Sequence, residues 1–494
     1  MILSIALAVP LLGALALAGY PRWSAAQARR IAMGAAGASL AALIVAWLGF
    51  DPQGPQFQHV VELPWVPSLG VAYRLGVDGI ALAVATMSAL LFSAAAIYPV
   101  DTRGEPRSYY AWLLFMQGVS LGVFLTLDLL LFYVFFDLSL VGMFFLIGRW
   151  GHGQPQLSAL KFFLYTFAGS LLLLLAIIGL YLSLEPRSFD MRQLIEQQPL
   201  AGGGLYAGLV FLALMLGLAI KTPLVPLHTW LPQAHVDAPG PVSAILAGVL
   251  LKMGVYGMIR LPLAMMAETF ARYAPWIGAL ALLSILYGAL VALGQQDLKR
   301  RIAYTSINHM GYSVLGIAAA AAWVGEPAAR QLALAGASLQ MVVHGLITGS
   351  LFLISGSLWQ RTGDYQLAHY GGLAYQAPLL TGFTVLAAFA SLGMPGLAGF
   401  VAEIQVFAGT LAVYPWLAAL AIVGILITAA LYLDMLRRLF FGHLPASLAS
   451  FSDLGRAEWL VLGVLSLGIV AIGVYPSFVL VLLEAASAAL VGGR

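Results

Sequence analysis

The stretch from Lys221 to Lys252, KTPLVPLHTWLPQAHVDAPGPVSAILAGVLLK, places titratable side chains between long apolar runs. Besides its two terminal lysines it contains His228, His235 and five prolines. A charged side chain is costly inside a bilayer, so such residues usually mark an ion or proton pathway. A helix broken by proline is tolerated there only where protein or a wet cavity satisfies the freed backbone groups. The stretch therefore favours proton or ion transport.

Four further titratable residues lie inside apolar runs. Asp137 is near the middle of DLLLFYVFFDLSLVGMFFLIG, and Glu403 is an isolated acid in GFVAEIQVFAG. His309 and His344 are central or nearly central in their own runs. Each one alone could be a hydrogen-bonded structural residue. Together they predict a protonatable relay of Asp137, Lys221, Lys252, His309, His344 and Glu403, with His228 and His235 as secondary candidates that flank the broken stretch.

Interactions between such groups are large enough for this work. Two unit charges ~7 Å apart interact by roughly 2.4 kcal/mol at an effective dielectric constant of ~20. Moving one charge against ~100 mV costs about 2.3 kcal/mol. One ion pair that opens and closes is therefore sufficient to bias a proton step against a membrane potential.

Composition identifies the medium in which these residues lie. Hydrophobic residues make up 62% of the 494-residue chain, charged residues only 9%, and the mean hydropathy is +0.95. These values indicate a polytopic membrane protein whose surroundings are the lipid bilayer. The net charge of +3 is small and scattered, which argues against nucleic-acid binding. Because the chain has no cysteine, it can hold neither disulfides nor thiolate-ligated clusters.

The elements that must position the relay are membrane-spanning helices of about 20 apolar residues. The N-terminal run is kept as a span because no basic residue precedes it, unlike in a signal peptide. The longer loops are 51–77 and 183–204, and FDMRQLIEQQP in the second predicts a short interfacial helix. The sequence predicts an all-α fold of fourteen spans at 2–20, 31–50, 78–98, 109–127, 129–148, 157–182, 205–230, 241–263, 275–294, 302–322, 331–357, 378–411, 416–438 and 458–482.

Two of these spans share an unusual feature. The seventh breaks at KTPLVP and the twelfth, five spans later, at LGMPGLAGF. Paired interrupted helices are typical of inverted-repeat transporters with an ion path at mid-membrane. We therefore expect two inverted five-helix repeats and four segments: 1–108 with helices 1–3, 109–263 with the first repeat, 264–438 with the second repeat, and 439–494 with the C-terminal connection and helix 14.

Basic residues predict the orientation. Loops after odd-numbered spans carry fourteen lysines and arginines, including Arg22 and Lys299, against seven on the opposite side. By the positive-inside rule the first set faces the cytoplasm. Both termini are therefore expected on the outer side.

Several motifs resemble one known family. The stretch KTPLVPLHTWLPQAHVDAPGPVSAILAGVLLKMGVYGMIR is similar to the central motif of the antiporter-like subunits of proton-pumping NADH:quinone oxidoreductase (complex I), specifically subunit M, which are related to Mrp-type antiporter subunits. The likeness continues through VDGIA at 77–81, FFLIGRWG at 144–151, INHMGYS at 307–313, MVVHGLITGSLF at 341–352 and GMPGLAGFVAE at 393–403.

The resemblance implies a role for each candidate residue. Asp137 and Lys221 would form a carboxylate–lysine pair, Lys252 would be the central lysine, and Glu403 the terminal group. His309 and His344 would connect them. One position departs from the family, which has glutamate where this chain has Asp137. The shorter side chain withdraws the carboxylate by ~1.5 Å, which would break a direct hydrogen bond while changing the coupling by only about half a kcal/mol.

The resemblance also implies partners and a location. The chain would be a redox-inactive subunit of a proton-translocating enzyme in the bacterial cytoplasmic membrane, with both termini on the periplasmic side. Paralogous antiporter-like subunits would lie on either side of it. No cofactor or metal is expected in this chain, and NADH, FMN, iron–sulfur clusters and quinone would belong to partner subunits.

Three alternatives stay open at the level of sequence. The first is a subunit of a Mrp-type Na+/H+ antiporter or of a related hydrogenase membrane arm. The second is a haem-binding quinol-oxidising subunit with His309 and His344 as axial ligands, and the third is an inert scaffold. Dinucleotide binding is not indicated, because the glycine-rich segments lie in apolar spans and follow no strand.

Overall fold

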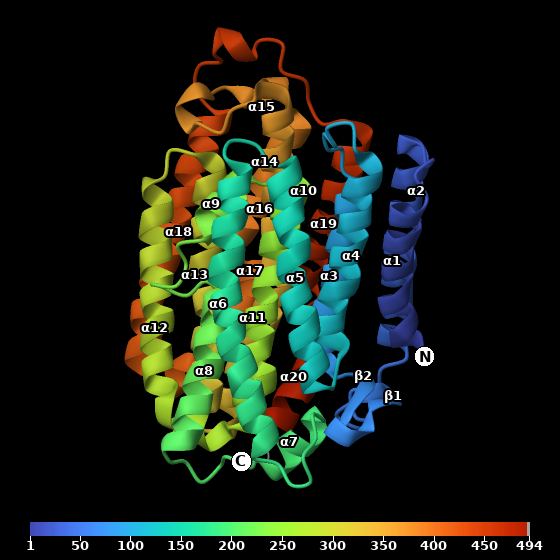
Figure 1. The fold of residues 1–494 in the computed structure, drawn as a ribbon. Helices are drawn as coiled ribbons and strands as arrows, with labels where there is room; N and C mark the ends of the chain where they lie inside the picture. Colours follow the sequence, from blue (N-terminus) through green and yellow to red (C-terminus); the bar gives the residue numbers. More distant parts are fainter. Residues whose placement is uncertain (492–494) are drawn as a thin grey trace.

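The computed structural model describes residues 1–491, so Gly492, Gly493 and Arg494 at the end of the predicted 439–494 segment lie outside the described residues. Long helices run side by side in one bundle, with the β-hairpin and the N-terminus towards one end (Figure 1). Within residues 1–491, eleven helices are long and apolar enough to cross a membrane. The chain is a mostly helical, multi-pass membrane protein.

The bundle consists of long helices and shorter pieces. The long helices are α1 Ile2–Gly19, α2 Ala25–Leu48, α3 Gly79–Ile97, α4 Pro106–Leu125, α5 Leu129–Trp150, α6 Pro155–Leu182, α12 Ala267–Gly294, α13 Leu298–Ala321, α14 Pro327–Thr362, α18 Pro415–Phe440 and α19 Arg456–Val474. The shorter helices are α7 Met191–Gln197, α8 Leu205–Lys221, α9 Leu231–Asp237, α10 Gly240–Ile245, α11 Leu251–Met258, α15 Leu373–Gln376, α16 Pro378–Ser391, α17 Ala398–Val413 and α20 Ser477–Val491. Helix α7 confirms the short helix predicted in the loop 183–204.

Local sequence sets many of the helix starts. Proline occupies the first position of α4, α6 and α14, where its missing N–H costs nothing. Asp78, Asp128 and Asp297 cap α3, α5 and α13 by accepting hydrogen bonds from backbone N–H groups of the first turn.

The two predicted interruptions are present. Helix α8 ends at Lys221 and α9 begins only at Leu231, while α16 ends at Ser391 and α17 begins at Ala398. The span between them that carries Lys252 is irregular in a way that the sequence did not reveal. Two π-helical segments, η2 Leu246–Leu250 and η3 Ile259–Leu263, flank α11 on either side. Such segments occur frequently at functional sites.

The all-α prediction is wrong in the loop 51–77. Strand β1 Gln58–Val66 pairs antiparallel with β2 Val71–Val77. Valine-rich segments favour an extended chain, and the hairpin is held to the bundle by charge. Arg74 of β2 donates to the Asp128 carboxylate at 2.7 Å and to Glu62 of β1 at 2.8 Å. The cap of α5 thus also anchors the hairpin.

The prediction of one continuous helix over 458–482 is also wrong. Helix α19 ends at Val474 and α20 begins at Ser477, with Pro476 between them. Proline lacks the N–H that would continue the helix. The second piece docks on α3, where a Cβ on Gly79 would lie only 2.0 Å from the Leu482 carbonyl oxygen. Only glycine permits this contact.

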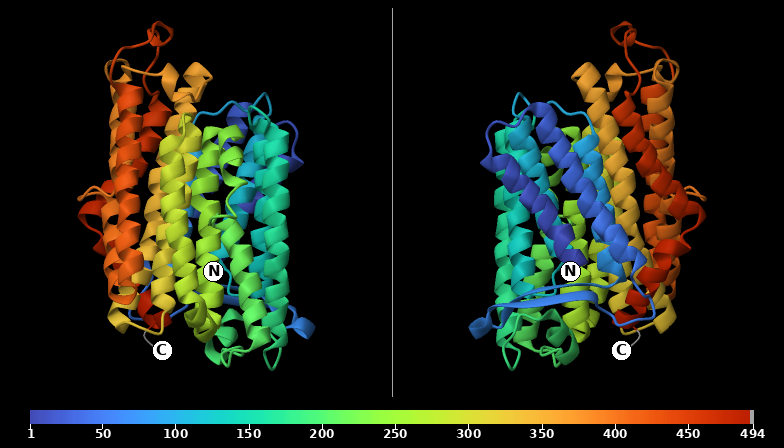
Figure 2. Two further views of the ribbon diagram at one scale, coloured as in Figure 1. Left: turned by 90° about the vertical axis from the view of Figure 1, so that its left-hand side faces the viewer. Right: turned by 90° about the vertical axis from the view of Figure 1, so that its right-hand side faces the viewer.

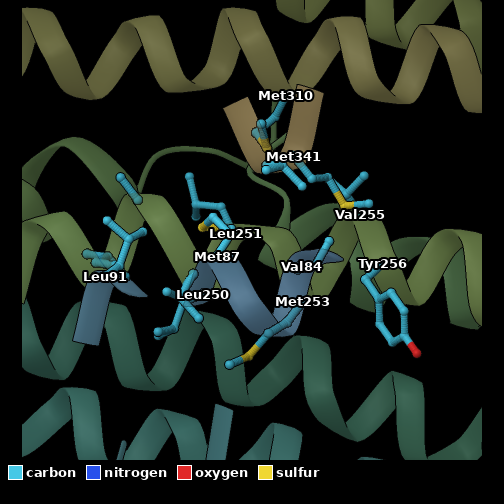
Figure 3. Close-up of a cluster of buried hydrophobic side chains, with 14 of the residues drawn as sticks. Val84, Met87, Leu91, Leu250, Leu251, Met253, Val255, Tyr256, Met310 and Met341 are labelled. Atoms are coloured by element: carbon cyan, nitrogen blue, oxygen red, sulfur yellow. The ribbon is translucent and has the colours of Figure 1, made fainter. Parts of the chain in front are cut away.

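The most buried elements lie at the centre of the bundle. The most apolar parts of α14 and of the span Gly240–Leu263 are wholly buried, whereas only a third of the residues in those of α1 and α18 are buried, at the periphery of the bundle (Figure 2). Figure 3 shows Leu250, Met253 and Val255 of the central span in one buried cluster with Met87 of α3 and with Met310 of α13 and Met341 of α14, which lie on the side of Val255. The elements that carry Lys252, His309 and His344 therefore form the core.

Candidate functional site

Lys252 lies at the centre of the site. Its side chain is fully buried, and its Nζ is hydrogen bonded to the Ala247 carbonyl oxygen at 2.6 Å and to His344 Nδ1 of α14 at 2.6 Å. The Ala247 carbonyl belongs to the π-helical segment η2, where i→i−5 bonding displaces the backbone. The π segment thus supplies one of the two hydrogen-bond partners of Lys252 Nζ.

Two histidines lie between Lys252 and Glu403. The rings of His344 and His309 lie with their centroids 5.4 Å apart, from neighbouring helices α14 and α13. His309 Nδ1 is 3.7 Å from Glu403 Oε1 of α17 and accepts a hydrogen bond from Gln340 at 3.3 Å. Lys252, His344, His309 and Glu403 therefore form one buried row, which we call the connected row.

A small polar cavity lies beside this row. It measures about 10 Å³, close to the least that holds one water molecule. Its lining includes His309, His344, Ser391, Gln340 and Glu403. A water molecule there would have several polar partners, so the cavity offers a bridge between the two histidines and the carboxylate.

Hydroxyl groups branch from His309 towards α18. His309 Nε2 is hydrogen bonded to Ser391 Oγ at 3.0 Å, Ser391 donates to Tyr432 at 2.8 Å, and Tyr432 donates to Thr305 at 3.2 Å. Hydroxyl groups both donate and accept hydrogen bonds, so this branch can pass a proton along its length.

The second interruption shapes the Glu403 end of the row. Gly393 has a φ of +77°, and a Cβ there would lie 2.4 Å from Glu403 Oε2. A side chain at this position would both strain the backbone and displace the carboxylate. The glycine of the break therefore allows the close approach of Glu403.

Asp137 and Lys221 are not joined directly. Lys221 is buried, donates to Ser139 Oγ at 3.1 Å and lies 5.0 Å from the centre of the Phe136 ring. Asp137 is half-buried and accepts a hydrogen bond from Ser170 at 2.8 Å. No ion pair within 4.0 Å joins the two among residues 1–491. The predicted carboxylate–lysine pair is open in this structure, in line with the shorter aspartate.

The break after Lys221 is satisfied by neighbouring side chains. Val225 N–H donates to Ser284 Oγ of α12 at 3.0 Å, and the Ile220 carbonyl oxygen accepts from the Trp230 indole at 2.9 Å. These contacts supply partners for backbone groups that the interrupted helix leaves free.

The secondary candidates lie off the connected row. His235 is fully buried and its ring stacks on Phe352 with centroids 4.4 Å apart. His228 is also buried, with its ring edge-on to Tyr287 and Tyr304. Neither ring contacts Lys252 or Glu403 directly among the contacts of the described chain.

Several site residues were missed by sequence reasoning. Ser139, Ser170, Gln340, Ser391 and Tyr432 are all neutral, and polar residues of this kind are common inside membrane bundles, so no sequence signal separated them. Lys299, counted with the loop charges, is fully buried and donates to the Ala238 carbonyl oxygen. Its position in a cluster of basic residues concealed its burial.

The arrangement does not suit a haem or a metal. His309 and His344 are already engaged with Ser391 and Lys252, and the cavity beside them is far smaller than a porphyrin. Residues 1–491 contain no group of three or more histidine, aspartate or glutamate side chains placed to hold a metal ion. The geometry favours proton transfer between side chains.

Comparisons with known proteins agree on one family. The family described as NADH:quinone oxidoreductase/Mrp antiporter, TM, matches residues 126–428. The chain is 38% identical over 498 residues to NADH-quinone oxidoreductase subunit M of Rhodobacter capsulatus, covering 97% of this chain and 94% of that protein. It is also 38% identical to NAD(P)H-quinone oxidoreductase chain 4 1 of a Synechococcus species, covering 96% and 90% of the two chains.

Solved structures give the same result. A chain of respiratory complex I from Thermus thermophilus with bound NADH superposes with a TM-score of 0.86 at 32% identity, covering all of both chains. A chain of the Mrp complex from a Dietzia species has a TM-score of 0.87, covering 100% of this chain and 97% of that one, at 22% identity. The second likeness concerns the fold alone.

Proposed function

Because this chain belongs to the NADH:quinone oxidoreductase/Mrp antiporter family of membrane subunits, we propose that its connected row carries protons across the membrane. The chain is the subunit-M-type, proton-translocating membrane subunit of a complex I-type NADH:quinone oxidoreductase. Its neighbours are other membrane-arm subunits of the antiporter-like kind. The enzyme activity belongs to the whole assembly.

One observation carries the proposed pathway. Lys252, His344, His309 and Glu403 come from four different elements and meet in one buried row, with successive contacts of 2.6 Å, 5.4 Å between ring centroids, and 3.7 Å. Each of these groups takes up and releases a proton. A neutral scaffold would gain nothing from burying them together, because buried ionisable groups are expensive.

Asp137 and Lys221 act as a gate on this pathway. Their side chains are held apart by separate serine partners, Ser170 and Ser139. Movement driven from a neighbouring subunit closes or opens the pair, which changes the electrostatic potential at Lys252. Any two unit charges ~7 Å apart at an effective dielectric constant of ~20 interact by roughly 2.4 kcal/mol, which is comparable with the cost of moving a charge against ~100 mV.

The finer architecture is part of the proposal. We assign fourteen crossings, with inverted repeats over 109–263 and 264–438 that follow three N-terminal helices in 1–108 and precede the segment 439–494. Support comes from the corresponding interruptions at α8–α9 and α16–α17. Basic residues concentrate in loops of one end, which assigns both termini to the periplasmic side of a bacterial cytoplasmic membrane.

Redox chemistry is proposed to lie outside this chain. The sequence has no cysteine for iron–sulfur ligation. We assign NADH, FMN, the iron–sulfur clusters and quinone to partner subunits. Of the two alternatives, an oxidoreductase subunit and an antiporter subunit, sequence identity favours the first. The chain is 38% identical to an oxidoreductase relative and 22% identical to the chain of the Mrp complex.

The experiment is NADH-driven proton uptake into sealed vesicles that contain the assembled complex, with quinone reduction measured in parallel. Lys252→Ala is expected to abolish most proton uptake per electron while the complex still assembles. Arg187→Gln, which changes an exposed arginine of the α6–α7 loop, is the control and is expected to match wild type. Full proton uptake in Lys252→Ala would refute the pathway.

A further inference from the structure

We propose that the groove between α8 and α12 binds an anionic glycerophospholipid, with one acyl chain in the groove and the phosphate on Arg272. The groove has a volume of about 380 Å³ and is lined almost entirely by apolar side chains of the two helices. Its lining includes Leu205, Leu209, Leu212, Leu216, Ile277 and Leu280. Both helices belong to the membrane-spanning bundle, so hydrocarbon is the medium that meets this surface.

The lining of the groove suits a hydrocarbon chain. Its walls are almost entirely apolar, so a flexible acyl chain can lie along them without covering an unpaired polar group.

The mouth of the groove supplies the charge. Gly204 lines the mouth, and a Cβ on the adjacent Gly203 would lie 3.0 Å from the Arg272 guanidinium. Arg272 is exposed, and no carboxylate of residues 1–491 lies within the 4.0 Å of an ion pair, Glu268 one turn earlier included. An arginine fork matches the oxygens of a phosphate. Arg272 is thus an available headgroup contact.

Aromatic residues mark the depth of this mouth. Trp276 is 77% exposed and Tyr273 is 39% exposed, one turn or less beyond Arg272 on α12. Tyr273 stacks on Phe211 of α8 with ring centroids 5.3 Å apart, so it also joins the two walls. Exposed tryptophan and tyrosine concentrate at the level of lipid headgroups. The arginine and the rings therefore lie where a phosphate and glycerol backbone would lie.

The inner end of the groove gives the lipid a role. Ala219 and Leu227 line it, and Leu227 belongs to the interrupted segment that follows Lys221. Pro226 and Thr229 of the same segment are exposed at the surface. An acyl chain against Leu227 would cover this backbone break from the bilayer side. The lipid would thus pack against the interrupted segment where it meets the bilayer.

The test uses the assembled complex in vesicles that contain either phosphatidylglycerol or phosphatidylcholine with a photoactivatable diazirine on the acyl chain. After illumination, labelled peptides are identified by mass spectrometry. In wild type we expect phosphatidylglycerol to label 205–219 and 273–280 more strongly than phosphatidylcholine does. Arg272→Gln should lower the phosphatidylglycerol label about fivefold and leave the phosphatidylcholine label unchanged.

Matched variants separate the headgroup from the groove. Leu212→Trp fills the groove and should lower the label from both lipids, whereas Leu175→Trp, an exposed leucine of α6, should lower neither. Arg272→Lys should keep most of the preference for phosphatidylglycerol, and Arg187→Gln should match wild type. Assembly of each variant is checked on native gels.

Two results would overturn the lipid site. Equal labelling in Arg272→Gln and Arg187→Gln would remove the headgroup contact. No labelling of the groove by either lipid in wild type would mean that a neighbouring subunit covers it. Because labelling needs neither NADH nor proton uptake, failure here leaves the proposed proton pathway intact.

Discussion

The two interrupted spans hold their charged residues in different ways. At the first break, Lys221 ends its helix and is held by a serine hydroxyl and an aromatic ring, apart from Asp137. At the second break, Glu403 lies inside α17, close to Gly393 of the break and 3.7 Å from His309. The second end belongs to a continuous row of titratable groups, and the first does not.

Under the proposed function, this difference suits the two ends to separate tasks. A row of buried neighbours, with a small polar cavity beside the histidines and the carboxylate, needs only small movements or one bridging water molecule to pass a proton. A pair that stands open must move before it influences its neighbour, so it suits a switch that another subunit drives. The comparison predicts that proton uptake is sensitive to the side-chain length of the acid at position 403. At position 137 a change in side-chain length should be tolerated.

The largest effect is expected at Glu403. Glu403→Gln keeps the shape of the side chain and removes its ability to titrate, so protons should stop at His309. Proton uptake per electron is expected to fall about tenfold or more. The control is Glu268→Gln, which neutralises an exposed carboxylate of α12 and should leave uptake unchanged. Normal uptake in Glu403→Gln would remove the carboxylate from the row.

Gly393 should be nearly as sensitive. Gly393→Ala places a Cβ 2.4 Å from the Glu403 carboxylate and forces alanine into a left-handed conformation that costs roughly 1–2 kcal/mol. We expect proton uptake per electron to fall about fivefold through displacement of the carboxylate. Gly382→Ala, on α16 with no atom near its Cβ, should keep wild-type uptake. Equal behaviour of the two alanine variants would contradict the close packing at Glu403.

Changing the side-chain lengths of Asp137 and Glu403 tests whether the two ends differ as described. Asp137→Glu adds ~1.5 Å of reach, which changes the coupling to Lys221 by about half a kcal/mol, so uptake should stay within about twofold of wild type. Glu403→Asp withdraws the carboxylate from His309 and should lower uptake about threefold. Both are measured as protons per electron in the same vesicles. A larger loss in Asp137→Glu than in Glu403→Asp would reverse the assignment of the two ends.

The smallest effect concerns stability at the first break. Ser284→Ala leaves the Val225 N–H without its acceptor, which costs about 1–3 kcal/mol when the group stays buried. The melting temperature of the detergent-solubilised complex should fall by a few degrees. Ser466→Ala, a buried serine of α19 away from the break, is the matched control. An unchanged melting temperature would show that water replaces the serine.

Much of this architecture can be predicted from the sequence, because the membrane-spanning helices and their interruptions depend on nearby residues: apolar runs form the helices and proline-rich segments break them. The breaks after Lys221 and Ser391 were predicted in this way. The β-hairpin at 58–77 was missed because it lies in a loop judged only by its length. The π-helical segments around Lys252 were missed because they arise from packing in the core and have no sequence pattern of their own.

The sequence predicted which titratable residues belong to the site better than it predicted which of them contact each other. Apolar helices lack a clear polar face, so the sequence does not say which way each titratable residue points. Lys252 and His344 are 92 residues apart in the chain and yet meet at 2.6 Å. Asp137 and Lys221 were expected to meet and do not. Side-chain contacts between helices depend on rotations that only the folded structure reveals.

The most direct test of a single proton row is a double-mutant comparison at its two ends. Protons taken up per electron are measured for Lys252→Met, Glu403→Gln and the double variant in sealed vesicles, with quinone reduction as the control for assembly. Residues in series block the same flux, so the account predicts that the double variant is no worse than the more severe of the two single variants. Independent losses that multiply in the double variant, or full uptake in either single variant, would contradict one connected row.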